Sequence, residues 1–299
     1  MYKQHFGLKE LPFSITPDTS FFFACPTYQQ ALNTLLVAAR NGEGFIKITG
    51  EVGTGKTLLC RKFLSTLDDG TFVTAYIPNP NLEPRSLMLA LADELEIEFE
   101  KDVDQHQLLK AINHRLLVHA RNGKRVLLCL DEAQAMPLES LEALRLLTNL
   151  ETEKRKLLQI VLFGQPELDE KLAQQNIRQL AQRITFHYRL GPLQRDDLDF
   201  YLAHRLAVAG FAGARLFGRD AVGALHKASG GVPRLVNIMA HKALMLAYGE
   251  GRQQIAARHI RAAAADTLAA RKVAPAWLPW LAGLAVAVLA CGITWIYIR

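Results

Sequence analysis

The feature that most constrains this chain is a glycine-rich run, residues 50–57, which reads Gly-Glu-Val-Gly-Thr-Gly-Lys-Thr. An apolar stretch that predicts a strand precedes the run, and a segment that predicts a helix begins at its end. Polyphosphate is a dense cluster of negative oxygens, so binding it requires a backbone that approaches closely with its N–H groups turned inward. Glycine allows that approach because it carries no Cβ and tolerates positive φ, and the helix N-terminus adds a favourable dipole. The run therefore predicts a phosphate-binding loop between a strand and a helix.

The residue types of this loop suit the separate parts of a magnesium–ATP complex. Lys56 is expected to reach the β- and γ-phosphates, while the hydroxyl of Thr57 is expected to ligate Mg²⁺. We therefore predict that the chain binds ATP together with Mg²⁺. The predicted nucleotide-binding residues are Gly50, Glu51, Val52, Gly53, Thr54, Gly55, Lys56, Thr57 and Leu58.

A second run, residues 125–132, is apolar until it ends in Asp131 and Glu132. A strand that is apolar on both faces suits the centre of a parallel sheet, and ligands bind at the carboxyl ends of such strands. Asp131 is therefore expected to hold the metal together with Thr57. Glu132 is expected to act as the base that polarises a water for attack on the γ-phosphate. The alternative interpretation is an ordinary buried strand followed by two solvated acids.

Strand and helix patterns alternate up to residue 191, and only helical patterns follow. This alternation predicts an α/β core over residues 1–191, a parallel sheet with helices on both faces, and a small all-helical domain over 192–271. The predicted strands are 44–49, 71–77, 125–130, 157–163 and 184–190. The predicted helices are 57–67, 87–95, 103–120 and 138–152 in the core, and 195–209, 218–228, 232–248 and 253–270 after it.

Residues 273–298 contain no Lys, Arg, Asp, Glu or His and are rich in Trp, Leu, Ala and Val. A stretch of this length spans a bilayer core of about 30 Å, so we predict one C-terminal transmembrane helix. Basic residues are frequent just before it, and by the positive-inside rule the bulk of the chain is expected in the cytoplasm. Residues 1–7 lack the layout of a secretory signal, which agrees with that orientation. A buried core helix is the alternative interpretation of 273–298.

Charge and cysteine content narrow the choice of partners. The net charge of +6 suits an anionic membrane leaflet or nucleic acid, and the basic residues before 273 make the leaflet the simpler explanation. The four cysteines are scattered without the spacing of metal ligands, so no cysteine-based metal site is expected.

The two nucleotide motifs and the two-domain organisation resemble those of AAA+ ATPases, and the resemblance implies three further positions. Gln165 is expected at the tip of the strand between those of the two motifs, where it would orient the attacking water. Arg183, with Arg178 as the second choice, is expected to reach the nucleotide of a neighbouring subunit, and Arg234 to reach the γ-phosphate from the helical domain. The alternative interpretations are a turn residue for Gln165, a solvated charge at a strand edge for Arg183 and a helix-surface charge for Arg234.

Longer segments carry a more specific resemblance: residues 6–18, 42–57, 131–134, 144–151 and 164–168 are similar to the ExeA/GspA family. Members of that family are membrane-anchored ATPases of bacterial secretion and pilus assembly. The resemblance implies that the amino-terminal segment packs against the core near the adenine.

Within that segment, Pro12, Phe13 and Pro17 are implied to shape the adenine pocket. The secretion members carry a periplasmic peptidoglycan-binding domain after the membrane span, whereas this sequence ends at Arg299. We therefore expect a closer similarity to the short relatives of mannose-sensitive haemagglutinin (type IV) pilus biogenesis, the MshM type.

The resemblance implies a single-pass ATPase of the bacterial inner membrane, with its ATPase domain in the cytoplasm. It would form a homo-oligomer and drive or regulate assembly of a type IV pilus or a related secretion apparatus, together with other inner-membrane assembly proteins. A nucleic-acid-dependent ATPase of the origin-binding or transposition type is an alternative, although nucleic acid is not the expected partner. A scaffold that binds ATP without hydrolysing it is a third possibility, against which Glu132 argues.

Overall fold

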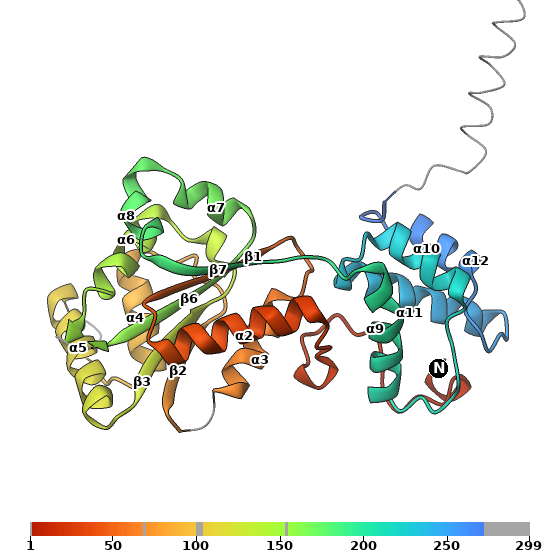
Figure 1. Ribbon diagram of the computed structural model, residues 1–299, viewed down its shortest axis with the longest axis horizontal. Coiled ribbons are helices and arrows are strands. Elements are labelled where there is room, and N and C mark those ends of the chain that lie inside the picture. The colour runs from red at the N-terminus through yellow and green to blue at the C-terminus, as the bar shows by residue number, and fades with distance from the viewer. Residues whose placement is uncertain (1, 68–69, 100–103, 153–154, 272–299) are drawn as a thin grey trace, which may run out of the picture.

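Five parallel strands form the sheet that organises the first two thirds of the chain (Figure 1). This computed structural model describes residues 2–67, 70–99, 104–152 and 155–271. The strands lie in the order β2-β3-β6-β1-β7. Their bounds are β1 Phe45–Gly50, β2 Phe72–Ile77, β3 Arg125–Leu130, β6 Leu158–Gly164 and β7 Ile184–Leu190. All five were predicted, and β6 lies between β1 and β3, which carry the two nucleotide motifs.

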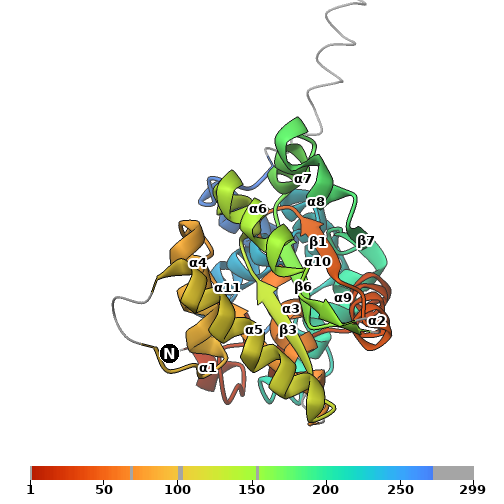
Figure 2. The same cartoon turned by 90° about the vertical axis from the view of Figure 1, so that its left-hand side faces the viewer.

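Helices cover both faces of this sheet, as the alternating pattern predicted. Figure 2 shows the sheet between α2 on one side and α4 and α5 on the other. Apolar side chains of alternate residues along the central strands contact α2 and α3 on one face and the other helices on the opposite face. The helices are α2 Pro26–Asn41, α3 Lys56–Thr66, α4 Pro84–Glu94, α5 Gln105–Arg121, α6 Leu138–Leu147, α7 Glu167–Leu172 and α8 Arg178–Ala181.

The helix predicted over 138–152 is too long. Helix α6 ends at Leu147, and a two-stranded antiparallel hairpin follows, β4 Glu151–Thr152 with β5 Arg155–Lys156. The sequence prediction missed this hairpin because its short strands follow directly on the apolar helical pattern. Helix α2 was not predicted either, although Pro26 at its first position and Gly42 after its end are ordinary helix boundary residues.

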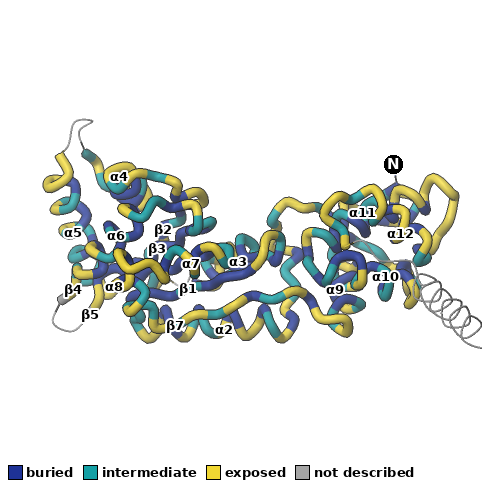
Figure 3. The backbone as a smooth tube through the Cα atoms, turned by 90° about the horizontal axis from the view of Figure 1, so that it is seen from above, coloured by how far each residue is buried: buried dark blue, intermediate teal, exposed yellow. Residues whose placement is uncertain are grey.

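Four helices after β7 pack into a separate half of the molecule, which we call the four-helix group. Figure 3 shows buried positions in both this half and the sheet half. The isolated bridge between Phe217 and Ile255 ties the loop before α10 to the loop before α12. The helices are α9 Arg195–Val208, α10 Arg219–Ser229, α11 Pro233–Gly249 and α12 Ala257–Ala265.

The amino-terminal residues pack on the four-helix group, although the sequence analysis grouped them with the core. Helix α1, Tyr2–His5, contacts α11, and the Tyr2 hydroxyl lies 2.8 Å from Nδ1 of His241. The ring of Phe13 contacts Phe217 edge-on, with 5.7 Å between ring centroids. The chain then crosses to the sheet half through residues 14–18, which we call the strap, and the short helix η1 Thr19–Phe21 packs on α3 and α9.

No helix within the described ranges is both long enough and apolar enough to cross a membrane. Residues 273–298, for which the sequence predicts a transmembrane helix, lie outside the described residues.

Candidate nucleotide-binding site

A cavity of about 280 Å³ lies where the phosphate loop, the strap and the four-helix group meet. The loop after β1 and the first turn of α3 form one wall, and the strap forms another. The ends of β3 and β6 contribute Glu132 and Gln165, and α9 and α11 contribute Arg205 and Arg234. The cavity thus gathers residues from segments far apart in the sequence at the carboxyl end of the sheet.

The phosphate loop has the expected conformation at two of its three glycines. Gly53 and Gly55 have φ of 81° and 89°, in the left-handed region that favours glycine. Gly50 is required for a different reason, because a Cβ there would lie 2.7 Å from the carbonyl oxygen of Leu190. The Tyr28 hydroxyl, which the sequence analysis missed, donates to the carbonyl of Thr54 and braces the loop from α2.

Lys56 points back into the loop that carries it. Its Nζ donates to the carbonyl oxygens of Gly50 at 2.8 Å and Glu51 at 3.1 Å. Only 5% of Lys56 is exposed, and burial lowers the pKa of its ammonium. These carbonyls therefore hold the ammonium inside the loop whose N–H groups would receive phosphate.

Thr57 and Asp131 are in direct contact, as a shared metal site requires. The Thr57 hydroxyl donates to Oδ2 of Asp131 at 2.6 Å. Asp131 is 2% exposed, and its pKa is raised by burial, against the lowering effect of the Thr57 hydrogen bond. A hydroxyl and a carboxylate oxygen are hard ligands that suit Mg²⁺ when phosphate oxygens and water complete the octahedron. No cluster of three His, Cys, Asp or Glu side chains able to hold a metal occurs in the described residues.

Glu132 lies in a hydrogen-bonded triangle with two glutamines. Its Oε2 accepts from Nε2 of Gln165 at 3.1 Å and from Nε2 of Gln134 at 2.6 Å. Oε1 of Gln134 in turn accepts the main-chain N–H of Gln165 at 3.0 Å. Glu132 itself has φ of 53°, a left-handed conformation that costs free energy in a non-glycine residue. The sequence placed Glu132 and Gln165 near each other but gave no role to Gln134, which joins them.

The three predicted arginines lie in different places. Arg234 lines the cavity from the first turn of α11, and its main-chain N–H donates to Gly53. Arg183 does not line the cavity; its Nη1 donates to the hydroxyl of Thr148 at 2.9 Å and so contacts the end of α6 in its own chain. Arg178 is exposed at the start of α8. Whether either reaches a neighbouring nucleotide stays a prediction.

The strap side of the cavity contains residues that the sequence did not reveal. Ile15 and Val52 both line the cavity and are 59% and 55% exposed, so apolar surface is available there. Tyr201 and Asn237 also line it, from α9 and α11. Tyr201 and Asn237 fit ordinary helical patterns, which do not indicate a ligand. Only the packing of the four-helix group against the sheet half brings them to the cavity. Of the three residues implied to shape the adenine pocket, Pro17 lines the cavity, whereas Pro12 and Phe13 do not.

Known proteins resemble this chain in sequence. A family model described as an AAA domain matches residues 39–172. General secretion pathway protein A of Aeromonas hydrophila is 43% identical over 287 residues, which are 96% of this chain and 51% of that protein. The chain thus spans about half the length of this curated relative.

Solved structures resemble the fold more distantly. CDC6P from Pyrobaculum aerophilum is 21% identical, with a TM-score of 0.69 over 86% of this chain and 71% of that one. The Aeropyrum pernix ORC2 protein, in ADPNP–ADP complexes, is 16% identical, with a TM-score of 0.63 over 86% of this chain and 73% of that one. At these identities the likeness concerns the fold alone, a P-loop α/β core with a parallel sheet. The AAA domain and the match to the secretion protein show that this chain is similar to AAA proteins of the ExeA/GspA type.

Proposed function

We propose that this protein binds ATP with Mg²⁺ in the cavity and hydrolyses it. The observation that carries the proposal is the approach of Gln165 to Glu132, 3.1 Å between Nε2 and Oε2, beside the Thr57–Asp131 pair. A protein that only bound nucleotide would need the phosphate loop and the metal carboxylate. It would have no use for a second carboxylate held next to a polar side chain at the adjacent strand end.

Each group has one task in the proposed reaction. Lys56 and the loop N–H groups hold the β- and γ-phosphates, and Thr57 and Asp131 hold Mg²⁺, which neutralises phosphate charge when bound. Glu132 accepts a proton from a water that Gln165 orients. The water oxygen bonds to the γ-phosphorus while the bond to the β-phosphate oxygen breaks, so ADP and phosphate leave. Arg234 reaches the γ-phosphate and stabilises the developing charge.

The four-helix group would serve as a lid in this cycle. Its α11 begins at the phosphate loop, so a triphosphate that contacts Arg234 would pull the group towards the sheet half. Arg183 or Arg178 would complete the site of a neighbouring copy, which makes activity dependent on a homo-oligomer. Both assignments are part of the proposal.

The likeness to a general secretion pathway protein supports a role in secretion. We propose that this role is to drive or regulate assembly of a secretion or pilus apparatus. On this proposal residues 273–298 anchor the protein in the bacterial inner membrane, the ATPase half faces the cytoplasm, and inner-membrane assembly proteins are its partners. The expected closeness to MshM-type pilus proteins remains part of this proposal.

Steady-state ATP hydrolysis by the full chain in liposomes tests the central claim, with Lys56→Ala and Glu132→Gln beside the wild type. Glu132→Gln should bind ATP with nearly unchanged affinity and turn over about 10²–10⁴-fold more slowly, because only the proton acceptor is lost. Lys56→Ala should lose binding as well. Unchanged turnover in Glu132→Gln would refute hydrolysis at this site, and a rise in turnover on adding duplex DNA would favour the nucleic-acid-dependent alternative.

A further inference from the structure

Arg205 of α9 is a buried arginine that reaches across the cavity wall to the strap. Only 4% of the residue is exposed. Its Nε donates to the carbonyl oxygen of Pro12 at 2.5 Å, and its Nη2 donates to that of Ser14 at 3.2 Å. The guanidinium also lies over the ring of Phe21, 4.6 Å from the centroid. None of the ion pairs among the described residues includes Arg205, so carbonyl oxygens and ring faces stabilise its charge.

Two neighbours extend this contact to a second helix. Nη1 of Arg205 donates to the hydroxyl of Tyr201 at 3.3 Å, and that hydroxyl donates to Oδ1 of Asn237 at 2.8 Å. Nδ2 of Asn237 lies 3.5 Å from the carbonyl oxygen of Ser14. Burial raises the pKa of Tyr201, so its phenol keeps the proton that it donates. Helices α9 and α11 therefore both hold the backbone where the strap begins.

The other end of the strap is held by the sheet half. Nη1 of Arg61, on α3, donates to the carbonyl oxygen of Pro17 at 2.8 Å. Oδ1 of Asp18 accepts the main-chain N–H of Ser20 at 2.9 Å and so caps η1. Between these two attachments, Ile15 faces the cavity with 59% of its surface exposed. The strap thus connects the two halves and forms one wall of the cavity. Arg205 holds the end of the strap that packs on the four-helix group.

We propose that Arg205 is a positioning residue for the nucleotide base. It holds the strap so that Ile15 covers one side of a flat aromatic base, while Val52 is a second exposed apolar side chain that lines the cavity. Because the phosphates are held by residues 53–57, the strap contributes to the binding of the base and not of the triphosphate. This inference rests on the proposed nucleotide site and adds that α9 sets how tightly the base is held.

A comparison of two ligands tests the role. Binding of Mg²⁺–ATP and of Mg²⁺–tripolyphosphate, which has the phosphates but no base, is measured by calorimetry on the full chain in detergent. Arg205→Lys keeps the charge but loses the planar fork that bonds two carbonyls at once. It should weaken ATP binding by about tenfold, whereas tripolyphosphate affinity should stay within about twofold. The KM for ATP should rise with kcat at saturation nearly unchanged.

Ile15→Ala provides a second variant that does not depend on a buried arginine, since Ile15 is mostly exposed. It should show the same selective loss of ATP binding. Arg215→Lys is the matched control, because Arg215 pairs with Asp199 at the surface of the same four-helix group. It should leave both ligands unaffected.

The possible outcomes distinguish the positioning role of Arg205 from the nucleotide site itself. If Arg205→Lys weakens both ligands equally, or weakens neither, the positioning role is overturned while the nucleotide site stands. If the wild type binds neither ligand, or if Lys56→Ala changes neither affinity, the nucleotide site itself fails and the inference fails with it.

Discussion

The main-chain N–H of Arg234 donates to the carbonyl oxygen of Gly53 at 3.1 Å, which joins the first turn of α11 to the phosphate loop. A second main-chain bond, from the N–H of Leu193 to the carbonyl oxygen of Gly231 at 2.8 Å, ties the linker after β7 to the turn before α11. Any movement of the four-helix group must therefore rearrange the backbone at the loop or at the linker. This contact gives a physical route by which an occupied phosphate loop would change the position of the four-helix group.

The Gly53–Arg234 contact makes Gly53 intolerant of a side chain. At Gly53 a Cβ would lie 2.7 Å from the Cβ of Arg234, in addition to the strain of φ at 81°. Gly53→Ala should therefore lower the free energy of unfolding by about 1–3 kcal/mol and weaken ATP binding. Gly7→Ala is the control, because Gly7 has φ of 67° but a Cβ added there would meet no atom within 4 Å. Urea unfolding should show a smaller loss in Gly7→Ala, and equal losses would contradict the contact.

Gln134 should matter for turnover more than for binding. Gln134→Ala removes one of two donors to Glu132 and frees the main-chain N–H of Gln165 from its acceptor. We expect kcat to fall about tenfold or more, because the base and the water-orienting amide lose their fixed geometry. The affinity for ATP should change little. Gln175→Ala, at an exposed position of the short helix η3 Gln175–Ile177, is the control, and a rise in KM without a fall in kcat would contradict this role.

The sequence predicted the sheet and the phosphate end of the site because their signals are local. The run 50–57 and the pair Asp131–Glu132 each specify backbone and chemistry within a few residues. The strap side of the cavity depends on contacts such as that between Arg205 and Ser14, which are 191 residues apart. Such pairs leave no pattern in one sequence, since a buried arginine on a helix face looks like a solvated one. Gln134 was missed for another reason: its amide function follows only from the left-handed turn at Glu132.

Stability should depend on pH through Asp131. Burial raises its pKa in the folded protein above the unfolded value, so the unfolded state releases the proton more readily. The free energy of unfolding should therefore decrease as pH rises from about 3.8 through the raised pKa. Asp131→Asn should remove this component and be more stable than the wild type near pH 7 without nucleotide or Mg²⁺, while losing hydrolysis.

Asp266→Asn is the control, because the contribution of Asp266 to the free energy of unfolding should depend on pH with the opposite sign. A hydrogen bond from Lys242 lowers the pKa of Asp266, so its contribution is present above the unfolded pKa and is lost as pH falls. Urea unfolding of the three proteins at about pH 3, below the unfolded pKa of both groups, and at pH 7, quoted as differences from the wild type, checks both signs. A loss of stability in Asp131→Asn at pH 7 would contradict the desolvation argument.

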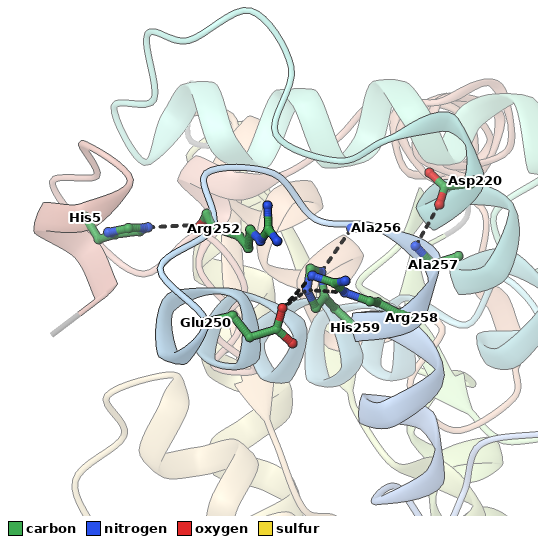
Figure 4. Close-up of polar contacts among 8 residues, drawn as sticks. All are labelled: His5, Asp220, Glu250, Arg252, Ala256, Ala257, Arg258 and His259. Carbon is green, nitrogen blue, oxygen red and sulfur yellow. Dashed lines mark hydrogen bonds and ion pairs between the residues drawn. The ribbon is translucent and has the colours of Figure 1, made fainter.

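His259 should stabilise the start of α12. Its Nδ1 accepts the main-chain N–H of Ala256 at 3.0 Å, and its Nε2 lies 3.2 Å from Oε2 of Glu250 (Figure 4). The ring is almost fully buried, with 2% of the residue exposed. His259→Ala should lower the free energy of unfolding by about 1–3 kcal/mol, because a buried partner is removed and the N–H of Ala256 is left unsatisfied.

Arg258→Ala is the control, since Arg258 pairs with the same Glu250 and its Nε lies 3.3 Å from Nε2 of His259, but its side chain is 55% exposed. It should cost about 0–1 kcal/mol. Equal effects in thermal or urea unfolding would mean that the ion pair, and not the buried ring, holds the helix.

Arg178 and Arg183 should behave differently when substituted, because of these two only the Arg183 side chain forms hydrogen bonds with described residues of its own chain. Arg183→Ala removes the bond to Thr148 and should destabilise the protein by about 1 kcal/mol, whatever it does to a neighbour. Arg178→Ala, at an exposed position, should leave the unfolding curve unchanged. If Arg178 serves a neighbouring site, Arg178→Ala should lower turnover by about 10³-fold without weakening ATP binding.

Mixing variants then identifies the subunit that supplies the arginine. Arg178→Ala retains an intact Glu132, and Glu132→Gln retains an intact Arg178, so a mixed oligomer contains some complete sites. Turnover regained on mixing would assign Arg178 to the neighbour's nucleotide. The same test applies to Arg183→Ala mixed with Glu132→Gln. If only this mixture regains activity, in proportion to the folded fraction of Arg183→Ala, then Arg183 acts between subunits in addition to bonding the end of α6. Turnover per subunit that does not vary with protein concentration, with no recovery in either mixture, would show that each copy hydrolyses ATP alone.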